Sequence, residues 1–205
     1  MFEGEKIRVG ALGSGRGSNI LAILDNIASS KLAAEMCVVL TDKADAPLRS
    51  SVAAQGITEI YVNPRDFADR RQYDLELIRL LREHRVDLVL LAGYMRVITK
   101  SFIDAFPLRI MNIHPSLLPA FRGLDVQKKA LEYGVKYSGC TVHFVDQGVD
   151  TGPIIIQAVV EVKDKDTPQS LSQRILKEEH RIYSEAIDLF VQGRLRVEGR
   201  RVLII

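Results

Sequence analysis

Hydrophobic positions along the chain follow two periods, one typical of buried strands and one typical of amphipathic helices. Five short apolar runs predict strands, over residues 7–12, 36–41, 58–62, 87–92 and 109–113. Three longer segments predict helices, over residues 18–29, 47–55 and 68–84. The alternation of strands with helices is typical of the α/β class, and it predicts a doubly wound, mostly parallel sheet with helices on both faces.

The pattern changes after Gly123. A predicted helix over 124–133 leads to two strand-like runs, over 139–145 and 154–162, which we expect to pair in antiparallel fashion. A long helix should follow, with Thr167 as its N-cap and Gly193 just after its end. The last twelve residues predict a hairpin that turns at Glu198-Gly199. No linker or repeat interrupts these elements, so we expect one domain over residues 1–205.

Composition argues against nucleic-acid-binding, membrane-spanning and secreted proteins. Hydrophobic residues make up 47% of the chain, and the formal net charge is only +2, which argues against a nucleic-acid partner. No apolar run approaches about 18 residues and none follows a basic start, so we expect neither a membrane span nor a signal peptide. Cys37 and Cys140 lack metal-ligand spacing, so we expect two buried free thiols, no metal and a cytoplasmic location.

A glycine-rich turn joins the first predicted strand to the first predicted helix. Glycines allow a close approach of the backbone to an anion, and a helix N-terminus supplies free N–H groups, so a phosphate is the expected ligand. Ser18 and Asn19 add side-chain donors. Gly13 and Gly15 also fit the dinucleotide fingerprint, and Asp42 ends the second strand, so this turn alone leaves an NAD-binding enzyme or an empty turn open.

A polar group at the end of the fifth predicted strand is the main candidate for chemistry. Strand alternation puts Asn112 and His114 on the same side of the chain, and Pro115 ends the strand. An amide donor beside an imidazole suits an oxyanion site that also moves protons. Asp150 lies in a glycine-containing loop and is able to hold a histidine charged, although Asp146 and Asp150 also fit the role of ordinary turn acids.

The last helix carries a carboxylate on its apolar side. Glu179 falls inside the stripe of Leu171, Ile175, Ile182, Ala186 and Leu189, whereas His180 falls opposite and should face solvent. A buried carboxylate is costly unless it is paired or meets a ligand, so Glu179 is either a ligand contact or half of a structural ion pair.

The segment from Asn112 to Pro119, Asn-Ile-His-Pro-Ser-Leu-Leu-Pro, together with Asp150-x-Gly152-Pro153, resembles the signature of folate-dependent formyltransferases. With Gly17-Ser18-Asn19, the chain is most similar to the branch that formylates glycinamide ribonucleotide. The likeness runs from about residue 6 to 195. Arg122 departs from the family pattern, in which proline or lysine is common at this position.

The resemblance implies roles for individual residues. Asn112, His114 and Asp150 match the catalytic trio. Gly17, Ser18, Asn19, Pro115 and Glu179 match positions that contact the ribonucleotide. The matches to folate-contacting positions are Arg70, Leu91, Met95, Arg96, Val97 and Ile98, with Asn112 and Asp150 shared. The match at Arg70 is loose because Arg71 lies beside it. A phosphate-binding half would cover about 1–105, and a catalytic and folate-binding half about 106–205.

The implied activity is transfer of a formyl group from 10-formyltetrahydrofolate to the amine of glycinamide ribonucleotide in purine biosynthesis. The expected partners are these two small molecules, and a homodimer is left open. Formyltetrahydrofolate deformylase and methionyl-tRNA formyltransferase share the trio, but they carry a further N-terminal or C-terminal domain that this sequence does not show. A non-catalytic nucleotide-binding module is the alternative from another class, and it would not need the trio.

Overall fold

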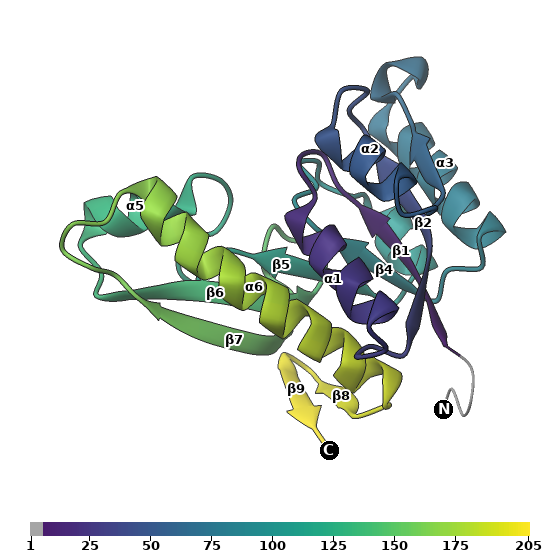
Figure 1. Cartoon of the computed structure of the whole chain (residues 1–205). Helices are drawn as coiled ribbons and strands as arrows, with labels where there is room; N and C mark the ends of the chain where they lie inside the picture. Colours follow the sequence, from purple (N-terminus) through teal and green to yellow (C-terminus); the bar gives the residue numbers. More distant parts are fainter. Residues whose placement is uncertain (1–5) are drawn as a thin grey trace. The chain divides into compact units, whose positions relative to one another are not determined.

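The computed structural model describes residues 6–205 (Figure 1). The chain divides into two compact units, Met1–Met111 and Asn112–Ile205. The boundary falls inside strand β5 (Ile110–His114), between Met111 and Asn112. The interpretation of the chain as a single domain stays a prediction.

The first unit is built on parallel strands. These are β1 (Ile7–Leu12), β2 (Ala34–Thr41), β3 (Glu59–Tyr61) and β4 (Leu88–Leu91). β1 pairs with β2 on one side and with β4 on the other, and β2 also pairs with β3, all in parallel. The chain therefore moves outward from β1 to β3 and then returns to the far side of β1, which is the reversal of a doubly wound sheet.

Helices of the first unit flank these strands. They are α1 (Ser18–Ala28), α2 (Pro47–Ala53), α3 (Arg70–Glu83) and α4 (Lys100–Ala105), with a short 3-10 turn, η1 (Pro64–Asp66). α1 contacts α2, and α3 contacts α4. A Cβ atom on Gly10 of β1 would lie 2.7 Å from the Leu81 side chain of α3, so the missing side chain lets helix and strand pack closely.

The second unit contains the antiparallel strands. β6 (Tyr137–Phe144) pairs antiparallel with β7 (Ile154–Glu161), and β8 (Leu195–Glu198) forms a hairpin with β9 (Arg201–Ile204). α5 (Val126–Tyr133) and α6 (Pro168–Val191) pack together, and α6 covers β6 and β7. The predicted fold class, a mostly parallel sheet with flanking helices and antiparallel strands toward the C-terminus, is confirmed.

Several local predictions are also confirmed. Thr167 caps α6 with a reciprocal pair of hydrogen bonds to Ser170, Gly193 follows the helix in a left-handed conformation, and the final hairpin turns at Gly199. Most element boundaries differ from the predicted ones by one or two residues, as expected for frayed ends.

Three predictions were wrong or incomplete. α4 was not predicted, because a six-residue helix that buries only Phe102 is too short to show a period. Cys37 is half-buried, whereas Cys140 is buried as expected. His180 is half-buried and its Nε2 atom is fully covered; α6 contacts α5 as well as β6 and β7, so more than one side of the helix is covered. Within residues 6–205, no helix combines the length and apolar character needed to cross a bilayer.

Candidate active site

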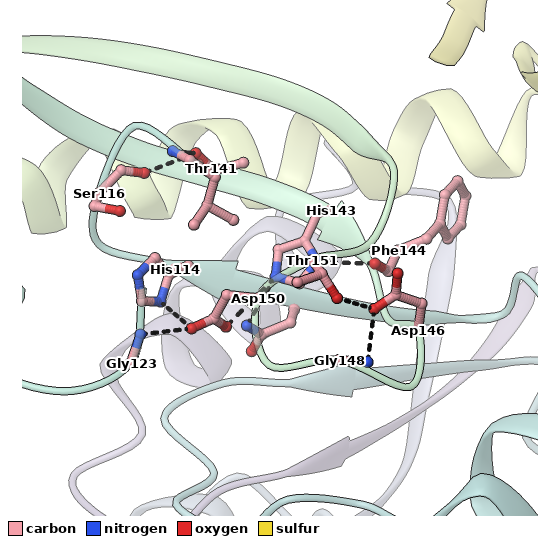
Figure 2. A network of polar contacts seen from close by, with 12 residues as sticks. His114, Ser116, Gly123, Thr141, His143, Phe144, Asp146, Gly148, Asp150 and Thr151 are labelled. Carbon is pink, nitrogen blue, oxygen red and sulfur yellow. Dashed lines mark hydrogen bonds and ion pairs between the residues drawn. The ribbon is translucent and has the colours of Figure 1, made fainter. Parts of the chain in front are cut away.

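Strand β5 carries two polar side chains into the second unit. Asn112 is the one half-buried residue of this otherwise buried strand, and His114 at its end is 5% exposed. His114 lies close to Asp150, with 3.4 Å between its Nδ1 atom and Oδ2 of the carboxylate (Figure 2). On its other side, His114 Nε2 lies 2.9 Å from the carbonyl oxygen of Phe121. Both ring nitrogens therefore face oxygen acceptors, an arrangement that complements the doubly protonated ring, which has two donors and no acceptor.

A second histidine, His143 on β6, completes this group. It is 2% exposed, and its Nδ1 atom lies 2.8 Å from the carbonyl oxygen of Phe144, so Nδ1 carries the proton. Nε2 is then an acceptor, and Asn112 donates to it from Nδ2 at 3.1 Å. Burial lowers the pKa of His143, and the nearby Asp150 raises it to a smaller extent, which fits a neutral ring.

This hydrogen bond fixes the amide of Asn112 and leaves its second N–H for another acceptor. The sequence patterns assigned no role to His143. Its contact with Asn112 joins two residues that lie 31 positions apart, and no pattern along the chain records such a contact. We refer to Asn112, His114, His143 and Asp150 as the histidine cluster.

Asp150 reaches the two histidines from the loop between β6 and β7. Its backbone is left-handed, with φ of 52°, and its Oδ2 atom also accepts a hydrogen bond from the Gly123 N–H at 2.9 Å. Asp146 organises the same loop by accepting from Gly148 N–H at 3.1 Å and from the Thr151 hydroxyl (Figure 2). A Cβ on Gly152 would lie 1.7 Å from the Phe144 carbonyl oxygen, so only glycine fits there.

A buried hydroxyl supports the turn that follows β5. Thr141 donates to the carbonyl oxygen of Ser116 at 2.7 Å and accepts from the Leu118 N–H at 3.1 Å. Gln157 donates to Thr141 Oγ1 and to the Leu118 carbonyl oxygen, both at 2.9 Å. Ser116 is 1% exposed and donates to the Ala120 carbonyl oxygen at 2.6 Å. These bonds hold the turn that carries the Phe121 carbonyl against His114.

The glycine turn, residues 13–19, lies in the first unit. Gly17 is the N-cap of α1 and has no side chain with which to cap the first helical turn. Its φ of 70° is left-handed, and a Cβ would lie 2.2 Å from Leu48 Cδ1. By contrast, a Cβ on Gly15 would have no neighbour within 4 Å. Ser18 is half-buried and Asn19 is 9% exposed at the start of the helix. The turn therefore presents backbone N–H groups at a helix N-terminus, the arrangement that binds anions.

The loop after β4, residues 92–99, carries four of the predicted folate positions, and Leu91 ends the strand before it. Met95 and Val97 are exposed, by 63% and 50%, whereas Leu91 and Ile98 are buried. Large exposed apolar side chains on one loop suit contact with a flat, weakly polar ring. The Arg96 guanidinium lies over the Tyr73 ring, 5.1 Å from its centre.

A contact with this loop distinguishes Arg70 from Arg71 as the predicted folate-contacting residue. Both side chains are exposed, and Arg70 donates to the Val97 carbonyl oxygen at 3.2 Å. Arg70 therefore lies beside the loop, as the resemblance suggested. Its contact with folate stays a prediction.

The remaining predicted residues lie in the second unit. Pro115 is half-buried directly after β5, and Glu179 is 7% exposed on α6, inside the predicted stripe of buried apolar residues. Among residues 6–205, no group of three or more His, Cys, Asp and Glu side chains is arranged to hold a metal ion.

The chain is similar to known proteins over most of its length. The family model described as formyl transferase matches residues 7–187. The chain is 40% identical to phosphoribosylglycinamide formyltransferase of Bacillus subtilis, covering 85% of this chain and 89% of that protein. It is 45% identical to the trifunctional purine biosynthetic protein adenosine-3 of Drosophila melanogaster, over 94% of this chain but only 14% of that much longer protein.

A solved structure, glycinamide ribonucleotide transformylase 1 from Symbiobacterium toebii, matches with a TM-score of 0.97. The two chains are 51% identical, and the match covers 98% of this chain and 95% of the other.

Proposed function

Because the chain belongs to the formyl transferase family, we propose that it transfers the formyl group of 10-formyltetrahydrofolate to the amine of glycinamide ribonucleotide, a step of purine biosynthesis. The observation that carries the proposal is the histidine cluster, in which an amide donor, an imidazole and a carboxylate converge in a largely buried setting. Such a group suits an acyl transfer, which develops negative charge on a carbonyl oxygen and moves one proton.

The reaction begins when the glycinamide amine attacks the formyl carbon carried on N10 of the folate. A tetrahedral intermediate forms, with an oxyanion where the formyl oxygen was. Asn112 donates its second amide N–H to this oxygen, because His143 already accepts the first. His114 gives up its contact with the Phe121 carbonyl and donates to the same oxyanion.

Collapse of the intermediate breaks the bond between carbon and N10. The attacking amine loses one proton and N10 gains one, so the transfer is balanced and yields tetrahydrofolate and the N-formyl product. The proton passes from the amine to N10 through water or directly. Asp150 faces His114 Nδ1 at 3.4 Å and balances the positive charge of the ring during this transfer. Burial raises the pKa of Cys140 to about 12, so this thiol stays protonated and does not compete as a nucleophile.

The two substrates require different surfaces, and the first unit offers both. The phosphate of the ribonucleotide fits the N–H groups of the glycine turn at Gly17, Ser18 and Asn19. The pterin ring fits the exposed apolar side chains of the loop after β4, at Met95 and Val97. In the second unit, Pro115 and Glu179 are the residues that we propose to contact the ribonucleotide. Two free cysteines and a formal net charge of +2 support a cytoplasmic enzyme without a nucleic-acid partner.

A direct assay tests the proposal. The protein is incubated with 10-formyltetrahydrofolate, with and without glycinamide ribonucleotide, and tetrahydrofolate, free formate and formylated ribonucleotide are quantified. We expect one formylated ribonucleotide for each tetrahydrofolate formed, and little formate. Formate release that does not depend on the ribonucleotide would instead identify a deformylase. Binding of the ribonucleotide without any turnover would favour a non-catalytic module.

A further inference from the structure

Ser14 of the glycine turn holds the near end of the loop after β4. Its N–H donates to the Gly93 carbonyl oxygen at 3.2 Å, and its hydroxyl oxygen accepts a hydrogen bond from the Met95 N–H at 3.0 Å. Both bonds join segments that lie 79 or more residues apart in the sequence. Met95, whose side chain is 63% exposed, is thus attached through its backbone to the turn that was assigned to the ribonucleotide phosphate.

The far end of the same loop is held by a different element. Arg70 of α3 donates to the Val97 carbonyl oxygen at 3.2 Å, and Asp74 of α3 accepts from the Thr99 N–H at 2.6 Å. Asp74 is 1% exposed, so this end is anchored in the interior. The loop therefore has two separate attachments, and only the one through Ser14 leads to the glycine turn.

The position of Ser14 makes it responsive to a ligand of the turn. Gly13 N–H donates to the Leu40 carbonyl oxygen of β2 at 3.1 Å, and the Gly15 carbonyl oxygen accepts from the Leu48 N–H of α2 at 3.2 Å. Ser14 lies between these two bonds, flanked by the most permissive residue type on both sides. An anion bound to the N–H groups that follow Gly15 restricts this short segment, and Ser14 is restricted with it.

We propose that Ser14 couples the two substrates: ribonucleotide phosphate at the glycine turn fixes, through the two hydrogen bonds of Ser14, the loop that receives the pterin ring. The inference rests on the proposed function and deepens it. Binding of the first ligand orders the turn and the loop, which lowers its own affinity by the conformational entropy that is lost. The second ligand then binds to a segment that is already ordered, so it binds more tightly. The effect is reciprocal, because each ligand must raise the affinity for the other by the same factor.

Titration calorimetry with tetrahydrofolate, which carries no formyl group to transfer, measures this factor with and without saturating glycinamide ribonucleotide. In the parent protein we expect the ribonucleotide to tighten tetrahydrofolate binding by about 5-fold or more. Ser14→Ala removes the hydroxyl acceptor of the Met95 N–H, and the factor should fall below about 2-fold.

Two variants separate coupling from a loop that is merely looser. Arg70→Ala removes one of the two bonds that hold the far end of the loop, so it should weaken tetrahydrofolate binding equally with and without ribonucleotide and leave the factor unchanged. Ser29→Ala is the same substitution at the C-cap of α1, the end of the helix opposite to the turn, where the hydroxyl donates to the Asp25 carbonyl oxygen at 2.8 Å. It should match the parent in every titration.

Amide hydrogen exchange of the parent protein gives a second measurement that needs no variant. Glycinamide ribonucleotide alone should slow exchange at the Met95 N–H and leave the Thr99 N–H, which is bonded to Asp74, unchanged. Unaltered exchange at Met95, absence of coupling in the parent, or full coupling in Ser14→Ala would each overturn the inference while leaving the proposed function intact. A parent that binds neither ligand would overturn both.

Discussion

The histidine cluster of the second unit and the glycine turn of the first unit are built in different ways. In the cluster, the proposed function depends on side chains, and most of their polar atoms are held by partners within the protein, as with His143 between Asn112 and the Phe144 carbonyl. In the glycine turn, the proposed function depends on backbone N–H groups, and apart from Arg16 and Asn19 the side chains are small or absent. Substitutions should therefore act through lost chemistry in the cluster and through backbone and packing effects in the turn.

The largest effect should follow from Asp150→Asn. This change keeps the shape but removes the charge that faces His114 at 3.4 Å, and we expect kcat to fall by about 10²–10⁴-fold. Because the two residues act as a unit, adding His114→Ala should cost little beyond the worse single change. Steady-state kinetics of the two single variants and the double variant measure this.

Asp146→Asn is the matched control for this prediction. Asp146 lies in the same loop and holds Gly148 and Thr151, but it does not contact His114. We expect it to lose less than about 10-fold in kcat. Equal losses in the Asp146 and Asp150 variants, or strictly additive losses in the double variant, would mean that Asp150 acts through loop structure.

The next effect concerns His143. Substitution His143→Leu removes the acceptor that orients Asn112, and a misplaced donor should lower kcat by about 10–100-fold with little change in KM. His180→Leu is the control, because burial also lowers the pKa of His180 although that residue lies on α6 and has no contact with Asn112. A kcat equal to that of the parent in His143→Leu would remove His143 from the mechanism.

The lowered pKa values of His143 and His180 predict how stability depends on pH. Burial lowers the pKa of His143 below its ordinary value of 6.5, so the unfolded state takes up a proton below that pH and the folded state does not. The contribution of the buried, neutral His143 to stability is thus present above pH 6.5, and it is lost as the pH falls below that value. Thermal unfolding at pH 7 and pH 5 should show a smaller acid-induced fall in Tm for His143→Leu than for the parent, and His180→Leu should behave similarly.

A smaller effect, on stability alone, separates two glycines of the turn. Gly17→Ala places a Cβ 2.2 Å from Leu48 Cδ1 in a left-handed backbone, and it should destabilise the fold by about 1–3 kcal/mol. Gly15→Ala meets nothing within 4 Å and should leave Tm unchanged. Denaturant unfolding of both variants provides the test, and equal stabilities would contradict it. A side chain at Gly17 therefore disturbs packing against Leu48, whatever it does to phosphate binding. Ser18→Ala removes one side-chain donor without this clash, so its effect on ribonucleotide affinity is easier to interpret.

Residue patterns predicted much of this structure because burial leaves a period in the sequence. The parallel strands, the stripe on α6 that includes Glu179 and the final hairpin were all visible in that way. Contacts between residues distant in sequence leave no such trace. The bond from Ser14 to Met95 and the acceptance of the Asn112 amide by His143 depend on how strands are placed side by side, so only the structure reveals them.

The smallest effect should be that of Glu179→Gln, which tests whether the buried carboxylate of α6 serves the ribonucleotide. Glu179 is 7% exposed, and burying a charge is costly, so the neutral variant should fold at least as well as the parent. If ribose hydroxyls or the amino group donate to this carboxylate, its loss should weaken ribonucleotide binding by about 10-fold, because hydrogen bonds to a charged group are stronger than neutral ones. Glu178→Gln is the matched control: it is the same change one residue earlier, where the carboxylate forms an ion pair with Arg181 at 2.8 Å, and it should leave ribonucleotide affinity unchanged. Calorimetric titration with glycinamide ribonucleotide and thermal unfolding are measured on both variants. Unchanged affinity combined with a marked loss of Tm in Glu179→Gln would assign the carboxylate to a structural ion pair, and the ribonucleotide would then depend on the glycine turn for most of its affinity.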